Sequence, residues 1–587
     1  MPVSIGHLQR DHDKGAGVML TSMIRMTFVG LTLICLFYVA TTIREDIEPA
    51  IADLVLTNGH IYTADSNAGI VAAVAIRNGR IIKVGSNEQM LVFTGEGTQT
   101  VDLGGHFAMP GFNDAHGHLA NAALQAMNLD LSGVGSLQDL KSMVAMQADK
   151  RDLGSWIYGR GWDESLWTDS QVPTRDDLDE VAADYAVFLE RADGHSAVVN
   201  SLALERASIG PDTPDPDGGV IVRDGLGRAT GWLKEKAANR AESLVPEPTR
   251  EQWRESLTIV MRQALESGVT SIQDDSLRIG SRGETAIEVL ESIYTQEGLP
   301  LRVTTWLPFE DSLASLDAWR TRLGVADPWL KSGLLKTNID GSGGSLSAAM
   351  LQPYSTEPGN RGLLLIDPGR LNQMVVERDA AGFQIGIHSI GDRANRLILD
   401  AYEMAIETNG RRDARHRVEH AQFLHDDDIG RFEPLGVIAS MQACHLLTDM
   451  RWAPDILGAK REHEGYRWNS LLSSGARIAF GTDFPVEPID PMRGLYAAVA
   501  REAEGGGPPG GWIPTERISI EQAIRAYTAD SAYAEFEEHR KGRLIPGQFA
   551  DIIVLSNDIT SIEAPQILAT EVLITIVDGV VRYERQP

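Results

Sequence analysis

Hydrophobic positions near both ends of the chain follow a β-strand pattern. Short runs of apolar and β-branched residues, each bounded by polar turn residues, occupy residues 53–63, 74–84, 550–555 and 572–583. The first two runs contain Asn58-Gly59 and Asn78-Gly79, and Asn-Gly supplies the positive φ angles that a two-residue hairpin needs. Because strands this short are not stable alone, we expect one small β domain assembled from both ends of the chain.

The central part of the chain alternates between helical and short apolar segments. The helical stretches 250–267 and 370–381 are followed by the apolar segments 268–272 and 383–387. This order predicts repeated βα units around a parallel sheet. The length between about residues 110 and 536 suits an eight-fold TIM barrel that carries insertions.

One insertion is visible in the barrel region. Residues from about 121 to 240 follow the first expected barrel strand and are rich in Trp, Asp and Gly. Loops at that place lie over the active face of a barrel, so we expect the insertion to shape a pocket. The predicted domains are a leader, the first part of the β domain, the barrel and the second part of the β domain, at residues 1–48, 49–108, 109–536 and 537–587.

The leader contains one apolar run behind Arg25. Residues 27–40 form it, and a run of about 14 residues is typical of a signal peptide rather than of a full membrane span. Export to the periplasm or the cell exterior is therefore the main interpretation. The alternatives are a membrane anchor over residues 19–43 and a helix buried in the fold. Several methionines precede the run, so translation starting at one of them is also consistent with the sequence: Met19, Met23 and Met26.

Composition limits the classes of partner. The 587-residue chain has 43% hydrophobic and 23% charged residues, ordinary values for a folded protein. Its net charge of -29 repels phosphate backbones, so nucleic acid is not an expected partner. Cys35 and Cys444 are its two cysteines, which excludes a disulfide framework and a thiolate metal site. A metal ion in this protein must therefore use nitrogen and oxygen ligands.

His116 and His118 are the first candidates for such ligands. They follow the segment Met109-Pro-Gly-Phe-Asn-Asp-Ala115. At a strand end, side chains two residues apart share one face, so both imidazoles can reach a single ion. A histidine pair at this spacing also occurs often by chance in surface loops. The candidates that follow it along the chain strengthen its interpretation as a metal-ligand pair.

Lys336 is the next candidate, in Gly333-Leu-Leu-Lys336-Thr-Asn-Ile-Asp340. An ammonium group resists burial, and burial lowers its pKa. A neutral lysine can take up carbon dioxide, and the two oxygens of the resulting carbamate can bridge two cations. The alternative is an ordinary lysine whose charged head reaches solvent.

His388, His420 and Asp483 each follow a short apolar or β-branched run. Singly, each has a structural explanation, as a core histidine or as a turn residue. Together with the three earlier candidates they fall on five separate βα units, in the order in which a barrel hydrolase presents metal ligands at the C-terminal ends of its strands. The combination predicts one metal site.

These motifs resemble those of the amidohydrolase superfamily, and more narrowly its amidohydrolase-3 branch, which includes YtcJ-like proteins and N-substituted formamide deformylase. The similarity extends from Ala52 to the C-terminus. The segments that carry it are Pro110-Gly-Phe-Asn-Asp-Ala-His116-Gly-His118, Lys336 with Asp340-Gly-Ser342, His388-Ser-Ile-Gly-Asp392, Glu419-His420-Ala-Gln422 and Gly481-Thr-Asp483-Phe-Pro-Val486. Further marks are Gly161-Trp162-Asp163, Arg191-Ala-Asp193-Gly-His195 and Gly231-Trp-Leu-Lys-Glu235.

The resemblance implies a distorted (β/α)8 barrel beside a composite β-sandwich formed from both chain ends. It implies that one or two divalent ions, usually zinc, are held by six side chains: His116, His118, carboxylated Lys336, His388, His420 and Asp483. The candidates for substrate contacts are Trp162, Asp163, His195 and Glu235. The segment Asp340-Gly-Ser-Gly-Gly-Ser-Leu-Ser347 lacks the Leu and Arg-Thr common in the branch, which predicts a loosened loop beside Lys336.

The leading functional hypothesis is a hydrolase that cleaves a non-peptide C–N bond in an amide, N-formyl compound or cyclic amide. Metal-activated water would attack, and Asp483 would move the proton to the leaving nitrogen. The alternatives are a catalytically silent exported binding or regulatory protein, and an esterase, lactonase or deaminase of the same fold. The expected partners are a small-molecule substrate, the membrane if residues 19–43 anchor the chain, and a second copy in a homodimer.

Overall fold

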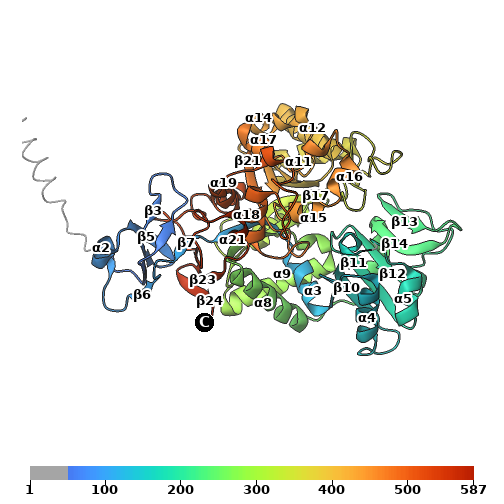
Figure 1. Cartoon of the computed structure of the whole chain (residues 1–587), viewed down its shortest axis with the longest axis horizontal. Coiled ribbons are helices and arrows are strands. Elements are labelled where there is room, and N and C mark those ends of the chain that lie inside the picture. Colours follow the sequence, from blue (N-terminus) through green and yellow to red (C-terminus); the bar gives the residue numbers. More distant parts are fainter. Residues whose placement is uncertain (1–49, 169, 587) are drawn as a thin grey trace, which may run out of the picture.

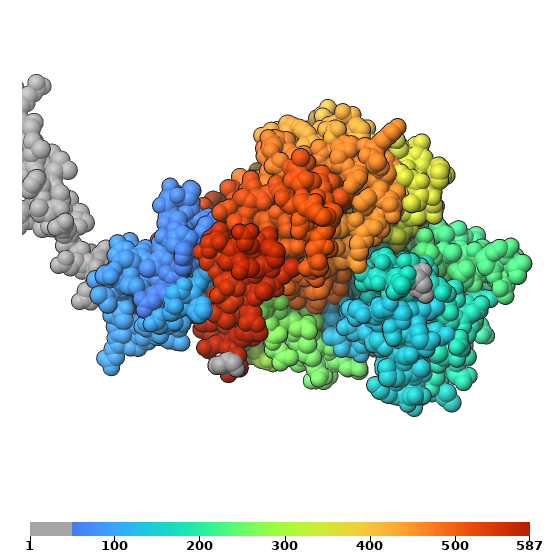
Figure 2. Space-filling view, viewed as in Figure 1, coloured from blue at the N-terminus to red at the C-terminus, as the bar shows by residue number. Residues whose placement is uncertain are grey.

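The computed structural model describes residues 50–168 and 170–586, which form a β-sandwich, a barrel and an inserted subdomain (Figure 1). The sandwich lies at one end of the molecule and the insertion at the other, with the barrel between them (Figure 2). The expected leader, including the apolar run 27–40, lies outside the described residues. Within the described part, no helix combines the length and apolar character that crossing a bilayer requires.

The sandwich contains strands from both chain ends, as expected. Its first sheet has the order β5-β4-β1-β6 and its second the order β24-β23-β22-β7-β2-β3. The strands of the first sheet are β1 (Leu54–Thr57), β4 (Ala73–Arg77), β5 (Arg80–Gly85) and β6 (Gln99–Asp102). Those of the second are β2 (His60–Tyr62), β3 (Ile70–Val71), β7 (Phe107–Pro110), β22 (Ile552–Leu555), β23 (Val572–Val577) and β24 (Val580–Glu584). The short helix α2 (Asn87–Met90) packs on β4 and β5, and α21 (Ala564–Ile567), between β22 and β23 in the chain, packs against the barrel helix α18 (Pro491–Ala500).

Only one of the two N-terminal Asn-Gly segments forms a hairpin. Asn78 and Gly79 have φ angles of 50° and 70° and join the antiparallel strands β4 and β5. The expected hairpin at Asn58-Gly59 is wrong, because β1 and β2 belong to different sheets. Leu56 and Ile61, on either side of this turn, enter the same core from opposite sheets, so the chain crosses over the core instead of folding back on itself.

The barrel is a nearly closed sheet of eight parallel strands in the order β21-β20-β19-β18-β17-β16-β15-β8. Its strands are almost entirely buried, as expected where helices cover a parallel sheet. They are β8 (Phe112–Gly117), β15 (Val269–Asp274), β16 (Arg302–Pro308), β17 (Leu330–Asn338), β18 (Ile385–Ser389), β19 (Arg417–His420), β20 (Ile438–Met441) and β21 (Arg477–Phe480). The longer helices of this part are α3 (Leu119–Met127), α8 (Arg250–Glu266), α9 (Ser281–Glu297), α10 (Leu313–Leu323), α11 (Pro368–Ala380), α12 (Asp392–Asn409), α18 (Pro491–Ala500) and α19 (Ile520–Tyr527).

The first and last barrel strands are joined at their C-terminal ends. The backbone N–H of Asp483 donates to the carbonyl of His116 over 2.8 Å, and the N–H of His118 donates to the carbonyl of Phe484 over 2.8 Å. Gly481 permits this approach, because a Cβ at that position would lie 2.5 Å from the backbone nitrogen of His116. The carboxylate of Asp114 accepts from the backbone N–H of Thr482 over 2.9 Å.

The insertion is a subdomain with its own mixed sheet, in the order β13-β14-β12-β11-β10-β9. The strands are β9 (Leu129–Asp130), β10 (Trp156–Trp162), β11 (Ala186–Arg191), β12 (Ser196–Val199), β13 (Gly219–Arg223) and β14 (Ala229–Glu235). Its helices are α4 (Leu137–Ala148), α5 (Arg175–Ala182), α6 (Ser201–Arg206) and α7 (Lys236–Glu242).

A buried charge network seals the N-terminal end of the barrel. Glu535 accepts hydrogen bonds from Asn113 (2.7 Å) and Thr304 (2.6 Å). Its oxygens also lie 2.7 Å from Lys541 Nζ and 3.6 Å from Lys331 Nζ. Burial by itself would raise the pKa of Glu535, but Lys541 and Lys331 outweigh it and hold the pKa at about 2.

We predict that Glu535→Gln changes the pH dependence of stability. The folded pKa of about 2 lies below the unfolded value near 4.3, so this carboxylate stabilises the fold above about pH 4.3 and loses its contribution as the pH falls towards 2. The variant should lose about 3 kcal/mol at pH 7, because buried Lys541 loses its paired carboxylate while Lys331 keeps only Glu537. It should also show a shallower loss of stability below pH 5. Urea unfolding at pH 7, 5 and 3.5 measures both effects.

Glu297→Gln is the matched control. Glu297 pairs with Arg254 at the surface with its side chain 67% exposed, so its loss should change stability by less than about 1 kcal/mol. Equal pH slopes for the wild type and Glu535→Gln would contradict the assignment.

Candidate metal centre and cavity

The structure brings the six expected metal ligands to one place. Each lies at or just after the C-terminal end of a barrel strand, and parallel strands present these ends on one face. They are His116 on β8, His118 after β8, Lys336 on β17, His388 on β18, His420 on β19 and Asp483 after β21. All six line one cavity of about 1060 Å³.

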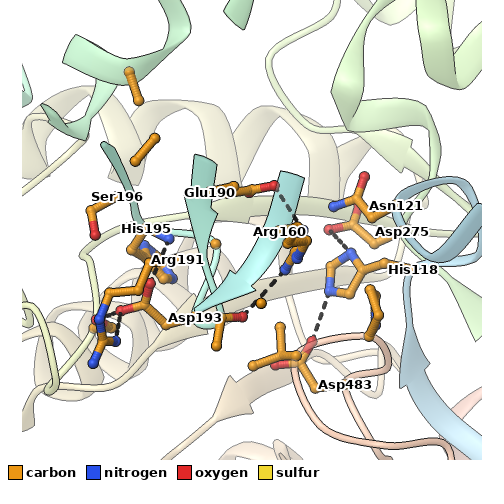
Figure 3. Close-up of a pocket in the computed structure, with 18 of the residues that line it drawn as sticks. His118, Asn121, Arg160, Glu190, Arg191, Asp193, His195, Ser196, Asp275 and Asp483 are labelled. Atoms are coloured by element: carbon orange, nitrogen blue, oxygen red, sulfur yellow. Dashed lines mark hydrogen bonds and ion pairs between the residues drawn. The ribbon is translucent and has the colours of Figure 1, made fainter. Parts of the chain in front are cut away.

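Asp483 lies at the centre of this group. Its Oδ1 is 2.8 Å from His118 Nε2 and 3.6 Å from His116 Nε2. Its Oδ2 is 3.1 Å from His445 Nε2 and 3.9 Å from His420 Nδ1. The pairing of Asp483 with His118 is visible in Figure 3. The carboxylate therefore joins two sets of three donors, each with ligand atoms within 4.8 Å of one another.

His116 is held with one ring nitrogen free. Its Nδ1 lies 2.8 Å from Glu419 Oε2, which fixes the ring and makes Nδ1 the protonated nitrogen. Arg417 in turn donates to the same Glu419 oxygen over 3.1 Å. His116 Nε2 is buried and has no hydrogen-bond partner among the described residues. A buried nitrogen lone pair directed at a carboxylate fits a cation bound between the two.

Burial sets the protonation of the donors. It lowers the pKa of His116, His388 and His420 well below the ordinary value, so these imidazoles are neutral, as metal ligands must be. Burial would raise the pKa of Asp483, but the neighbouring His116 and His118 hold it well below its usual value. The residues present thus form an anionic, nitrogen-rich set that suits a divalent cation such as zinc.

Lys336 lies in the same wall of the cavity. It is 1% exposed, and its Nζ is 3.3 Å from Asp275 Oδ2. Burial lowers the pKa of this lysine, and Asp275 opposes the change. Asp275 is also held by Arg278 at 2.8 Å.

His445 and Asp275 are site residues that the sequence interpretation missed. His445 follows β20, and Asp275 is the first residue after β15. Asp275 directly follows a buried barrel strand, and that position was the signal available in the sequence. His445 instead begins the short helix α15 (His445–Asp449), beyond the end of β20. His445 Nδ1 also lies 3.9 Å from Glu487. Burial by itself would lower the pKa of His445, but the carboxylates of Asp483 and Glu487 raise it to about 10.

Three of the four expected substrate contacts line the cavity: Asp163, His195 and Glu235. His195 Nδ1 lies 3.1 Å from Glu235 Oε2, and its ring centre is 5.0 Å from that of His388. Glu235 has φ 51° and ψ -132°, a strained backbone for a residue with a side chain. These residues place the insertion directly beside the metal centre.

Trp162 does not line the cavity, which corrects the expectation that it contacts the substrate. It is fully buried in the core of the insertion, where its indole N–H donates to the carbonyl of Leu189 over 2.9 Å. Burial of an indole ring is most favourable when its N–H has a hydrogen-bond acceptor. The core of the insertion provides both the burial and the acceptor.

The glycine-rich segment after Lys336 is packed and not loose. A Cβ on Gly343 would lie 2.6 Å from the indole of Trp452, so the ring occupies the space of the missing side chain. The hydroxyls of Ser342 and Ser345 donate to Asp193 over 2.8 and 2.9 Å. The segment therefore fastens the insertion to the barrel.

Residues 99–583 match the model of the Amidohydrolase family. The chain belongs to this family, and the nearly closed barrel agrees with it. It is thus a hydrolase of the metal-dependent amidohydrolase superfamily.

Relatives match over almost the whole chain. The protein is 37% identical to Protein LONG AFTER FAR-RED 3 of Arabidopsis thaliana, over 92% of this chain and 93% of that protein. It is 28% identical to N-substituted formamide deformylase of Arthrobacter pascens, over 91% of this chain and 98% of that enzyme. An uncharacterized metal-dependent hydrolase from Pyrococcus horikoshii OT3 superposes with a TM-score of 0.69 at 28% identity, covering 87% of this chain and 99% of that one.

We predict that Trp162→Phe destabilises the fold without affecting the metal centre. The substitution leaves the carbonyl of Leu189 without its indole donor and reduces packing in the insertion, which should cost about 1–3 kcal/mol. Unfolding in urea and metal content measure the two effects. A variant of unchanged stability that loses metal would contradict the position assigned to Trp162.

Proposed function

We propose that this protein hydrolyses a non-peptide C–N bond in an amide, N-formyl compound or cyclic amide, with one or two divalent ions, expected to be zinc. The observation that carries the proposal is the carboxylate of Asp483 within 4 Å of four imidazoles, His116, His118, His420 and His445. The similarity to a formamide deformylase supports a C–N bond as the target.

The chain's own groups define the proton transfers. A divalent ion at this centre would acidify water and polarise the scissile carbonyl. The neighbouring imidazoles keep Asp483 deprotonated, so one of its carboxylate oxygens can accept the proton of the attacking water. The same oxygen then delivers this proton to the leaving nitrogen, which becomes a free amine or, in a cyclic amide, the amino group of the opened ring.

We extend the proposal to Lys336 and the insertion. Burial moves Lys336 towards the neutral amine that can add carbon dioxide and lose a proton, giving a carbamate whose oxygens would be further ligands for the ion. Asp163, His195 and Glu235 would contact the substrate, because they line the cavity from the insertion side. The ring of His195 lies beside that of His388, with ring centres 5.0 Å apart.

The first test is the metal content of the purified protein. We expect about one to two equivalents of zinc by plasma mass spectrometry, largely lost in His116→Ala and Lys336→Ala because each removes a donor from the buried set. His539→Ala is the matched control, since that side chain is 86% exposed and does not line the cavity. A wild-type protein that contains no metal and takes up no added zinc would overturn the proposal.

The second test separates proton transfer from metal binding. Asp483→Asn keeps an oxygen ligand but cannot accept the proton, so kcat for an N-substituted formamide should fall at least about 100-fold while much of the metal remains. Asp317→Asn, at an exposed position, controls for loss of a carboxylate. A panel of matched formamides, amides and esters identifies the bond, and an enzyme that cleaves only the esters would contradict the C–N assignment.

A further inference from the structure

Arg160 and Glu190 form an unassigned polar pair in the wall that the insertion contributes to the cavity. They lie opposite each other on the neighbouring strands β10 and β11. Both residues line the same cavity as Asp483, and Figure 3 shows them paired on adjacent strands of the insertion. The pair therefore faces the space that a substrate bound at the metal centre would enter.

Arg160 has more donors than the protein uses. The residue is 3% exposed, yet it makes one ion pair, from Nη1 to Glu190 Oε2 at 3.2 Å, and one long hydrogen bond, from Nη2 to the carbonyl of Ala192 at 3.4 Å. Its Nε has no partner among the described residues. Arg191, one strand away, pairs instead with three carboxylates, Asp163, Glu164 and Asp193. A buried guanidinium with unpaired N–H groups costs folding free energy. The few partners of Arg160, compared with those of Arg191, therefore indicate that its remaining N–H groups are available to a ligand.

Glu190 likewise has an unused oxygen. Its Oε2 accepts from both Arg160 and the hydroxyl of Tyr158, the latter over 3.0 Å. No hydrogen bond to its Oε1 is formed within residues 50–168 and 170–586. A free acceptor thus lies beside the free donors of the guanidinium.

Gly194 leaves this donor and acceptor uncovered. It lines the cavity with φ +71°, and a Cβ there would lie 3.1 Å from Arg160 Nη2 and 3.5 Å from Glu190 Oε1. Both atoms therefore lie within 3.5 Å of one point at the cavity wall, close enough together for one small polar group of a ligand to bond to both.

We propose that the hollow binds a neutral amide group of the substrate, distant from the bond that is cleaved. The amide carbonyl accepts from Arg160 Nη2, and the amide N–H donates to Glu190 Oε1. A carboxylate would satisfy Arg160 but be repelled by Glu190, and a ketone or ester would leave Glu190 without a donor. This inference rests on the proposed function for the bond that is cleaved, and it defines the substrate class as C–N compounds with a second carboxamide.

Binding of three small sulfonamides tests the proposal apart from catalysis, because their S–N bond resists hydrolysis. The probes are N-(methylsulfonyl)glycinamide, its methyl ketone isostere and the free acid N-(methylsulfonyl)glycine. We expect calorimetry on the zinc-loaded full chain to show the amide binding at least about tenfold more tightly than the other two, since each lacks one of the two hydrogen bonds.

Two variants assign this preference to the pair. Glu190→Gln removes the repulsion, so the acid should gain at least about tenfold in affinity relative to the amide. Arg160→Lys keeps the charge but loses the guanidinium fork, so the amide and the ketone should both weaken by about tenfold. Glu247→Gln, the same change at an exposed position on the cavity rim, should alter each affinity by less than about threefold. Melting temperatures verify folding, and Glu190→Gln decides the question if Arg160→Lys does not fold.

Equal binding of the three probes by the wild type, no measurable binding of the amide, or a preference that survives Glu190→Gln would overturn the subsite. Formate release from N-formylglycinamide, measured in parallel, tests the chemistry separately. Selective binding without hydrolysis would leave the subsite standing and remove the proposed function. Hydrolysis without selective binding of the amide probe would leave the proposed function standing and remove the subsite.

Discussion

The closing of the barrel between its first and last strands is the constraint on which the site depends. His116 and Asp483 are 367 residues apart in the sequence, yet the N–H of Asp483 donates to the carbonyl of His116. Gly481 makes this contact sterically accessible, since any side chain there would meet the backbone of β8. Without this approach, the carboxylate and the first histidine pair would belong to separate edges of an open sheet, and no common cation could be bound.

The metal centre is built from groups that are unfavourable in isolation. Burial removes the charge of His116, His388 and His420 and disfavours the ammonium of Lys336. The carboxylate of Asp483 retains its charge because the nearby His116 and His118 hold its pKa well below the usual value. Such a set favours binding of a divalent ion, because one ion would both accept the free lone pair of His116 and balance the charge of Asp483.

The insertion supplies what the barrel lacks. The barrel face provides donors for an ion, whereas Arg160, Glu190 and His195 reach the cavity from the inserted sheet. Hydrogen bonds from Ser342 and Ser345 to Asp193 hold this sheet against the segment that follows Lys336. In the proposed function, the chemistry and the choice of substrate would therefore be carried by different parts of the fold, as is common where one scaffold supports many reactions.

The sequence by itself determined the fold class and the six candidate ligands. Local patterns carry that information, because strand ends in a parallel barrel share one face and the residues after each apolar run are therefore neighbours. The hairpin at Asn78 followed from turn chemistry in the same way. The tertiary structure alone decided that the turn at Asn58 crosses between sheets, that Trp162 is core and that His445 joins the site. These outcomes depend on which surfaces bury one another and on contacts between distant segments, and no local periodicity encodes them.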